Sequence, residues 1–258
     1  MSEAAERSRD GRDPKTRRGV LLRGATVLAV APSWGATLAV PRAAAAASPL
    51  DASPDDTTSG GPLSPERVLR ILEQGNQRWV AGDLRHPNQT VARREQLAAG
   101  QNPLATVFSC IDSRVPPEIV FDRGVGDLFV VRTAAQTNDG LIQGAVEYGV
   151  QEALTPLLVV LGHQRCGAVS FAVETLNAGA EAPAHLKDVV DALRPAYEAA
   201  RNLPGDQVDN TIRAQIRLTV HQLRHDALLE PYERDGRARV VSAYYSLDTG
   251  SVDFCFCT

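Results

Sequence analysis

The sequence predicts an α/β domain with a central, mostly parallel β-sheet that is flanked by helices. Three short apolar runs, at 106–108, 128–131 and 157–161, are nearly continuous and rich in branched residues, as strands buried on both faces are. Helical patterns lie between and after these runs, and this alternation of strands and helices is typical of parallel sheets.

The remaining elements follow in chain order. Ser64 and Pro65 indicate a helix start, with serine as the cap and proline at the first helical position, and the apolar spacing continues this helix to about Val80. Further helices are predicted at 91–99, 141–153, 168–176, 184–200 and 208–229. Two strand-like runs, 238–247 and 251–256, surround the turn signal Asp-Thr-Gly, so the last strand is expected to be antiparallel at the C-terminal edge.

Residues 1–47 resemble a bacterial export signal of the twin-arginine type. Arg17 and Arg18 directly precede a moderately apolar stretch at 20–40, and the alanine run at 43–47 offers small-residue cleavage sites. An arginine and a proline within the apolar stretch make it a poor membrane span, so no stable span is expected after processing. We therefore expect an exported protein, periplasmic or extracellular. A disordered basic tail and an uncleaved anchor are the alternatives.

Residues 48–63 are polar and turn-rich, which predicts a flexible linker before a single domain at 64–258. The formal net charge of -4 is unevenly spread, because residues 1–47 carry eight basic and four acidic side chains and the rest carries 19 and 27. A domain with this acidic balance has no electrostatic reason to bind nucleic acid. Four cysteines are too few for a disulfide scaffold in 258 residues, so metal binding or catalysis is considered first.

Two polar segments, CIDSR and GHQRCG, follow the first and third predicted strands. Ligands of open α/β sheets bind beyond the carboxyl ends of the strands, so both segments are expected at one edge. Cys110, His163 and Cys166 offer two thiolates and an imidazole, a donor set that suits Zn²⁺. A lone cysteine after a strand is usually a small buried hydrophobe, and the combination of both segments is the stronger signal. Three donors fit a catalytic site with an open position, which Asp112 could occupy.

The segments CIDSR, VPPEIVFDRGVGDLFVVR and GHQRCGAV together resemble the β-class carbonic anhydrases. The pattern of that family is Cys-x-Asp-x-Arg, followed after about fifty residues by His-x-x-Cys, and the resemblance extends from about residue 64 to about 254. It implies one zinc ion per chain and reversible hydration of carbon dioxide to bicarbonate and a proton through a zinc-bound hydroxide. It also implies an N-terminal helical arm and a homodimer or tetramer.

By this resemblance Cys110, His163 and Cys166 are the zinc ligands, and the catalytic residues are Asp112, Arg114 and Gln101. Asp112 would accept a hydrogen bond from the hydroxide while Arg114 holds it away from the metal. If that clamp slips, Asp112 becomes a fourth ligand in a closed state. Gln101 stands where plant-like members have a glutamine that binds bicarbonate. Activity is expected to rise with pH above neutrality, because ionisation of the zinc water and release of Asp112 both favour it.

Some positions depart from the family pattern. Ala135 and Gln136 stand where many members have Gly-Asn, which predicts an altered cleft wall or dimer contact. Ile111 replaces a commonly small or polar residue, with an effect expected on packing alone. Val107 occupies the place where a bicarbonate-inhibited subgroup has tryptophan, which speaks against that subgroup's regulatory pocket.

Two other functions remain open on the sequence alone. Relatives of this fold hydrolyse carbonyl sulfide or carbon disulfide with the same zinc ligands, and the shape of the cleft decides between these substrates. The other alternative is a zinc-binding scaffold without turnover, against which the intact catalytic residues speak. His221 and His225 lie four apart without a third ligand nearby and are interpreted as a solvated helix face. Cys255 and Cys257 are expected to be free thiols, or to oxidise outside the cytoplasm.

Overall fold

The computed structural model describes residues 63–254. The expected export signal at 1–47, the linker before Leu63, and Cys255 and Cys257 lie outside the described residues, so these predictions stay predictions. Within the described part, no helix combines the length and the apolarity that a membrane span requires.

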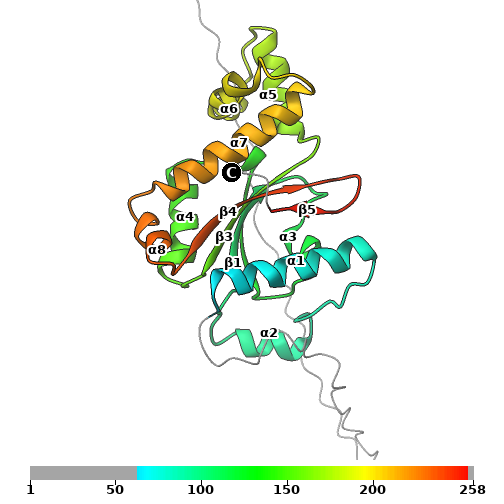
Figure 1. Ribbon diagram of the computed structural model, residues 1–258, viewed down its shortest axis with the longest axis vertical. Helices are drawn as coiled ribbons and strands as arrows, with labels where there is room; N and C mark the ends of the chain where they lie inside the picture. The colour runs from blue at the N-terminus through cyan, green and yellow to red at the C-terminus, as the bar shows by residue number, and fades with distance from the viewer. Residues whose placement is uncertain (1–62, 255–258) are drawn as a thin grey trace, which may run out of the picture. The chain divides into compact units, whose positions relative to one another are not determined.

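A five-stranded sheet forms the centre of the domain (Figure 1). Its strands are β1 (Ala105–Cys110), β2 (Leu128–Thr133), β3 (Leu157–His163), β4 (Arg239–Tyr245) and β5 (Val252–Asp253). The spatial order is β2-β1-β3-β4-β5, and all neighbours are parallel except β4 and β5, which are antiparallel. The predicted α/β class, with a mostly parallel sheet and an antiparallel C-terminal edge strand, is confirmed.

Helices cover both faces of this sheet (Figure 1). In chain order they are α1 (Pro65–Ala81), α2 (Val91–Leu97), α3 (Pro117–Val120), the 3₁₀ helix η2 (Ala134–Gln136), α4 (Gly140–Gln151), α5 (Gly167–Asn177), α6 (Leu186–Ala200), α7 (Gln207–Arg224) and α8 (Glu230–Arg234). The first helix begins as its sequence indicates, because the Ser64 side chain accepts a hydrogen bond from the N–H of Arg67.

Alternate residues of the strands enter two separate cores. On one face, side chains such as Val107 and Val159 pack with Leu72 of α1. On the other face, side chains such as Phe108 and Val160 pack with residues of α4, α5, α6 and α7. Because β1 and β3 are covered on both faces and buried throughout, they read as continuous apolar runs in the sequence.

The structure differs from the sequence prediction at the long helix expected over 208–229. The α7 helix ends at Arg224, and the Asp226 side chain accepts hydrogen bonds from the N–H groups of Leu228 and Leu229. Such a local turn competes with helix continuation, so the chain re-enters a helix only in α8. The sequence does not predict the two short helices α3 and η2, since four and three residues are too few to show a period.

Candidate metal centre

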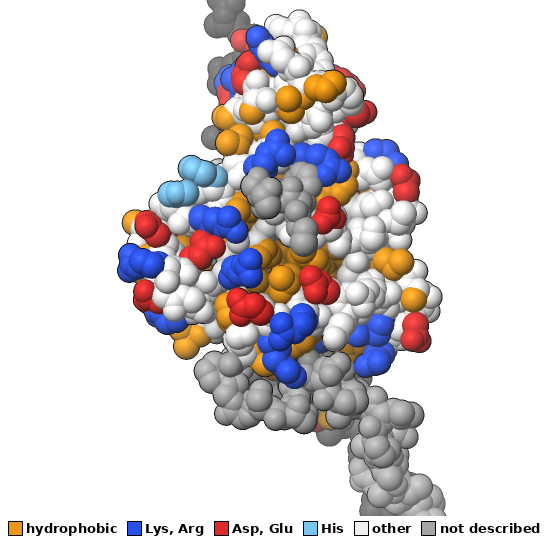
Figure 2. Space-filling view, viewed as in Figure 1, with side chains coloured by type: hydrophobic (Ala, Val, Ile, Leu, Met, Phe, Trp, Pro, Cys, Tyr) orange, Lys and Arg blue, Asp and Glu red, His pale blue; other side chains and the backbone are white. Residues whose placement is uncertain are grey.

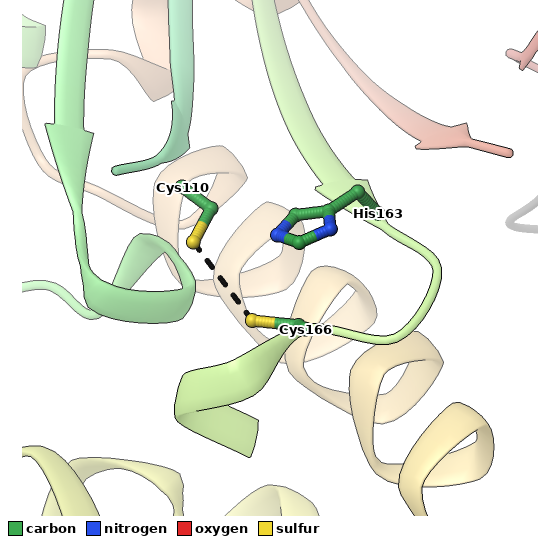
Figure 3. Close-up of side chains that lie close together, drawn as sticks. All are labelled: Cys110, His163 and Cys166. Atoms are coloured by element: carbon green, nitrogen blue, oxygen red, sulfur yellow. Dashed lines mark hydrogen bonds between the residues drawn. The ribbon is translucent and has the colours of Figure 1, made fainter. Parts of the chain in front are cut away.

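Three donor side chains meet at the carboxyl edge of the sheet (Figure 3). Cys110 is the last residue of β1, His163 is the last residue of β3, and Cys166 directly precedes α5. Their donor atoms lie within 4.8 Å of one another, and all three residues are buried. Because β1 and β3 are adjacent and parallel, the two strand ends bring donors 53 positions apart to one point.

The orientation of the His163 ring is set by its backbone neighbour. Its Nδ1 lies 3.0 Å from the carbonyl oxygen of Gln164, which can only accept, so Nδ1 carries the proton. The Nε2 lone pair therefore faces the two sulfur atoms, and no hydrogen-bond partner for this buried nitrogen exists among residues 63–254. A buried polar nitrogen without a hydrogen-bond partner destabilises the folded protein unless a ligand binds to it.

The two sulfur atoms form a coupled pair, with Cys110 Sγ 3.8 Å from Cys166 Sγ. The hydrogen bond from Cys166 lowers the pKa of the Cys110 thiol to about 4, although burial opposes this, and the N–H of Ala135 adds to the lowering. The same contact, together with burial, raises the pKa of Cys166. One proton is thus readily lost from the pair and the second is held, and a bound cation would release the second.

Asp112 and Arg114 stand beside this cluster. The guanidinium of Arg114 holds the carboxylate of Asp112 in a two-pronged contact, with Nε to Oδ1 at 2.9 Å and Nη2 to Oδ2 at 2.7 Å. These hydrogen bonds lower the pKa of Asp112 to about 2, so the carboxylate is ionised. Its Oδ2 atom also lies 3.8 Å from Nε2 of His163, so the pair borders the point where the three donors converge.

Two further residues support the cluster: the sequence does not single out Arg132, and it predicts for Ala135 only an altered cleft wall or dimer contact. Arg132, near the end of β2, donates to the carbonyl oxygens of Cys110 (2.8 Å) and Asp112 (2.6 Å) and so fixes the backbone of the CIDSR segment. The sequence signal that could have identified Arg132 is its position at the end of an apolar run, which places it at the same edge of the sheet as the three donors. Ala135 has a φ of 54°, a conformation unusual for alanine, and this aims its N–H at Cys110 Sγ, 3.4 Å away.

Gln101 is not brought to the cluster within one chain. It is exposed and precedes β1, whereas Cys110 ends that strand. A strand of this length spans roughly 17–20 Å. A role for Gln101 at a metal centre would therefore have to be exerted on another copy of the chain, and that assignment stays a prediction.

The donor set fits a metal ion, because Nε2 of His163 is unpartnered and the two thiols share a proton. Among the described residues, this is the one group of histidine, cysteine and acidic side chains whose donor atoms converge in this way. Two sulfurs and one imidazole nitrogen are characteristic ligands of zinc. Fold and site together define a metal-binding α/β domain with its centre at the carboxyl edge of a parallel sheet.

Comparison with known proteins agrees with this class. The family model described as "Carbonic anhydrase" matches residues 105–252. Carbonic anhydrase 2 of Mycobacterium tuberculosis is 41% identical over 189 residues, covering 72% of this chain and 91% of the relative. Carbonic anhydrase of Mycolicibacterium smegmatis is 38% identical over 192 residues, covering 74% and 93%.

Solved structures show the same fold. A tetrameric β-carbonic anhydrase of Sordaria macrospora superposes with a TM-score of 0.57 at 19% identity, covering 63% of this chain and 85% of the other. A β-carbonic anhydrase of Coccomyxa does so with a TM-score of 0.54 at 20% identity, covering 72% and 86%. The chain belongs to the carbonic anhydrase family, and its fold is that of the β-carbonic anhydrases.

Proposed function

We propose that this protein is a zinc carbonic anhydrase, which hydrates carbon dioxide reversibly to bicarbonate and a proton. The observation that carries the proposal is the convergence of Cys110, His163 and Cys166, with the Nε2 atom of the histidine buried and directed at both sulfurs. These three residues would hold one zinc ion per chain. The zinc would lower the pKa of a water molecule, so that hydroxide is available near neutral pH.

Asp112 is suited to orient the reacting water. Its carboxylate is ionised, since its pKa is about 2, and its Oδ2 atom borders the cluster, so it can accept a hydrogen bond from a water molecule there. An acceptor in a fixed position directs the oxygen lone pair of that water toward carbon dioxide.

Arg114 is suited to keep Asp112 in that role. Both oxygens of the carboxylate are engaged by its guanidinium, and Arg114 is itself tied to the carbonyl oxygen of Arg165 at 3.3 Å. A planar, two-pronged contact fixes orientation as well as distance. With this clamp in place, the carboxylate is restrained from turning to the metal as a fourth ligand.

The proposal is tested by the initial rate of carbon dioxide hydration, followed by stopped-flow with a pH indicator on the zinc-loaded full chain. We expect a rate that rises from about pH 7 to pH 9, the range in which a zinc-bound water ionises, and that is lost with Cys166→Ser. A protein that holds one zinc per chain but shows no rate above buffer would contradict the proposal. The same assay with carbonyl sulfide and carbon disulfide distinguishes the alternative substrates, and the names of the curated relatives favour carbon dioxide.

A homodimer, or a tetramer built from it, is part of the proposal. The strand β2 ends the sheet, and among the described residues no further strand pairs with its outer side. Next to it on α4, Leu141 is 86% exposed and Tyr148, whose ring contacts Phe129 of β2, is 56% exposed. An apolar sheet edge of this kind favours a second copy as its cover. Analytical ultracentrifugation should find a dimer or larger, which Leu141→Asp weakens and Leu203→Asp, at an exposed leucine in the turn after α6, does not.

Export through the twin-arginine route is the last part of the proposal. It is supported by Arg17 and Arg18 ahead of the apolar stretch at 20–40. That route carries folded proteins, so zinc could be bound before export and protect the cysteines. Cell fractionation should find the protein outside the cytoplasmic membrane, and replacing both arginines with lysine should retain it inside. Export of the variant at the normal level would contradict this route.

A further inference from the structure

The turn between two of the proposed zinc ligands has an unusual backbone. Arg165, between His163 and Cys166, has a φ of +52°, in the left-handed region that residues with a side chain rarely adopt. This conformation reverses the chain after β3, so that Cys166 returns toward His163 at the start of α5. Something outside the turn must therefore favour a conformation that arginine does not itself prefer.

The carboxylate of Asp248 engages this turn with both oxygens. The guanidinium of Arg165 donates to it through Nη1 (3.0 Å) and Nη2 (2.7 Å). The side-chain amide of Gln164 donates to the same carboxylate at 2.9 Å. Both consecutive residues of the turn are thus tied, through three N–H donors, to a residue more than 80 positions away.

Asp248 is itself held in place, because the β4–β5 hairpin turn that carries it is anchored on α1 through Asn76 and Trp79. Asn76, which is 5% exposed, donates to the carbonyl oxygen of Gly250 at 2.8 Å and accepts from the N–H of Val252 at 2.8 Å. The ring of Trp79 packs against Gly250 so closely that a side chain there would collide with it. The carboxylate of Asp248 is therefore presented from a fixed support.

The same turn also connects to the catalytic carboxylate. The carbonyl oxygen of Arg165 accepts from Nη2 of Arg114, the atom that also holds Asp112. A change in the backbone of Arg165 would move this acceptor as well as the Cys166 donor. One contact on the hairpin is thus linked both to the ligand turn and to the Asp112 clamp.

We propose that Asp248 is a positioning residue of the zinc centre, which holds Arg165 in its left-handed conformation and so keeps the ligand turn in register. The inference rests on the proposed zinc function. Asp248 touches neither the donors nor the reacting atoms, and it acts only through Gln164 and Arg165. Because the ion pair is more than half exposed at both partners, its effect is moderate.

The test is the rate at which the zinc-loaded full chain releases its metal to an excess of a chromogenic chelator. We expect Asp248→Ala to release zinc about 5- to 10-fold faster than wild type, near the lower end of the effect of removing outer partners of metal ligands. Arg165→Asn should release zinc near the wild-type rate, because asparagine adopts the left-handed region readily. In the Arg165→Asn background, Asp248→Ala should add less than about twofold if the contact acts through the arginine.

The matched control is Asp191→Ala, which breaks an exposed carboxylate–guanidinium pair with Arg194 on α6 and should leave release unchanged. Release at the wild-type rate by Asp248→Ala would overturn the inference alone, and so would an undiminished effect of Asp248→Ala in the Arg165→Asn background. A wild-type chain that retains no zinc would overturn the proposed function with it. If Asp248→Ala does not fold, Asp248→Asn keeps the shape of the side chain and carries the same test.

Discussion

Two groups of side chains in this protein contain histidines that could bind a metal, and one group is buried while the other is exposed. Cys110, His163 and Cys166 are buried at the ends of two strands and the start of a helix, with one ring nitrogen unpartnered among the described residues. His221 and His225 stack at 4.2 Å between ring centroids on the exposed face of α7, and Nδ1 of His225 lies 2.8 Å from the carbonyl oxygen of His221. Figure 2 shows pale-blue histidine side chains exposed on the face that it draws.

The difference teaches that donor type alone does not make a metal centre. In the buried cluster the backbone of three elements fixes the donors, and Nε2 of His163 has no hydrogen-bond partner among the described residues, so a bound ligand would satisfy it. In the exposed pair, water can hydrate the rings, and no third donor converges on them among the described residues. Substitutions of buried, fixed polar groups and of exposed ones test this contrast. They follow in order of decreasing expected effect.

The largest effect is expected for Cys166→Ser. Serine is a preferred residue at the position before a helix, so α5 should form normally, while the loss of one thiolate removes the metal. Bound zinc, measured by atomic absorption, should fall well below one per chain, and hydration of carbon dioxide should fall to the level of buffer. Retention of both zinc and activity would show that the buried cluster is not the metal centre.

A smaller loss is expected for Arg114→Ala, which removes the two-pronged contact with Asp112 and leaves the three donors intact. Misplacing a group that orients a reactant costs about 100-fold in rate. We expect kcat/KM for carbon dioxide to fall by about this factor at unchanged zinc content. Equal loss with Arg194→Ala, at an exposed and paired arginine of α6, or no loss at all, would argue against a clamp at this position.

Asp122 is a buried charged residue that lies outside the proposed metal centre, and it allows the same comparison of buried with exposed groups. Burial alone would raise its pKa, but hydrogen bonds from Arg78 and from the N–H groups of Arg85 and His86 outweigh this and hold the pKa below the ordinary 3.8. The side chain is 1% exposed, so Asp122→Asn should cost about 3 kcal/mol in the free energy of unfolding.

The pH dependence of that cost has a definite sign. A folded-state pKa below the unfolded value stabilises the protein above that value, and the stabilisation is lost as pH falls through the folded pKa. The difference in unfolding free energy between wild type and Asp122→Asn, from urea titrations, should therefore be full at pH 5 to 7 and shrink below about pH 4. The exposed Asp191→Asn should leave the free energy of unfolding close to that of wild type. A constant difference down to pH 2 would contradict the assignment.

A small gain is expected for Ala135→Gly. Glycine adopts a φ of 54° without the steric cost that alanine has, although it loses more backbone entropy, so the net gain in stability is about 0.5 kcal/mol. Ala172→Gly, in the middle of α5 with ordinary helical geometry, should instead destabilise by about 1 kcal/mol. Thermal unfolding followed by circular dichroism distinguishes the two. Destabilisation of equal size at both positions would contradict the strain at Ala135.

The smallest effect is expected for the double variant His221→Ala/His225→Ala. Because both rings are exposed and approach no third donor among the described residues, zinc content, activity and stability should stay within experimental error of wild type. The check is atomic absorption beside the hydration assay. A loss of half the bound zinc would reveal a second site on α7.

The sequence was sufficient to predict the sheet and the three metal-donor residues, because the patterns that indicate them are local in the chain. The runs that form β1 and β3 are buried along their whole length, and the cysteine and histidine donors directly end or follow them. The contacts of Asp248 with Arg165 and of Arg132 with Cys110 were not predictable, since they join residues 83 and 22 positions apart through side-chain geometry. The left-handed backbone of Ala135 was equally hidden, because alanine gives no signal for it.

The most direct test of the central claim is X-ray absorption at the zinc edge on the purified full chain. We expect two sulfur atoms at about 2.3 Å from the zinc and one imidazole nitrogen at about 2.0 to 2.1 Å, with any further ligand a light atom. The sulfur signal should be weakened or lost with the metal in Cys110→Ser and Cys166→Ser. A wild-type spectrum without sulfur, from a sample that holds one zinc per chain, would contradict the account.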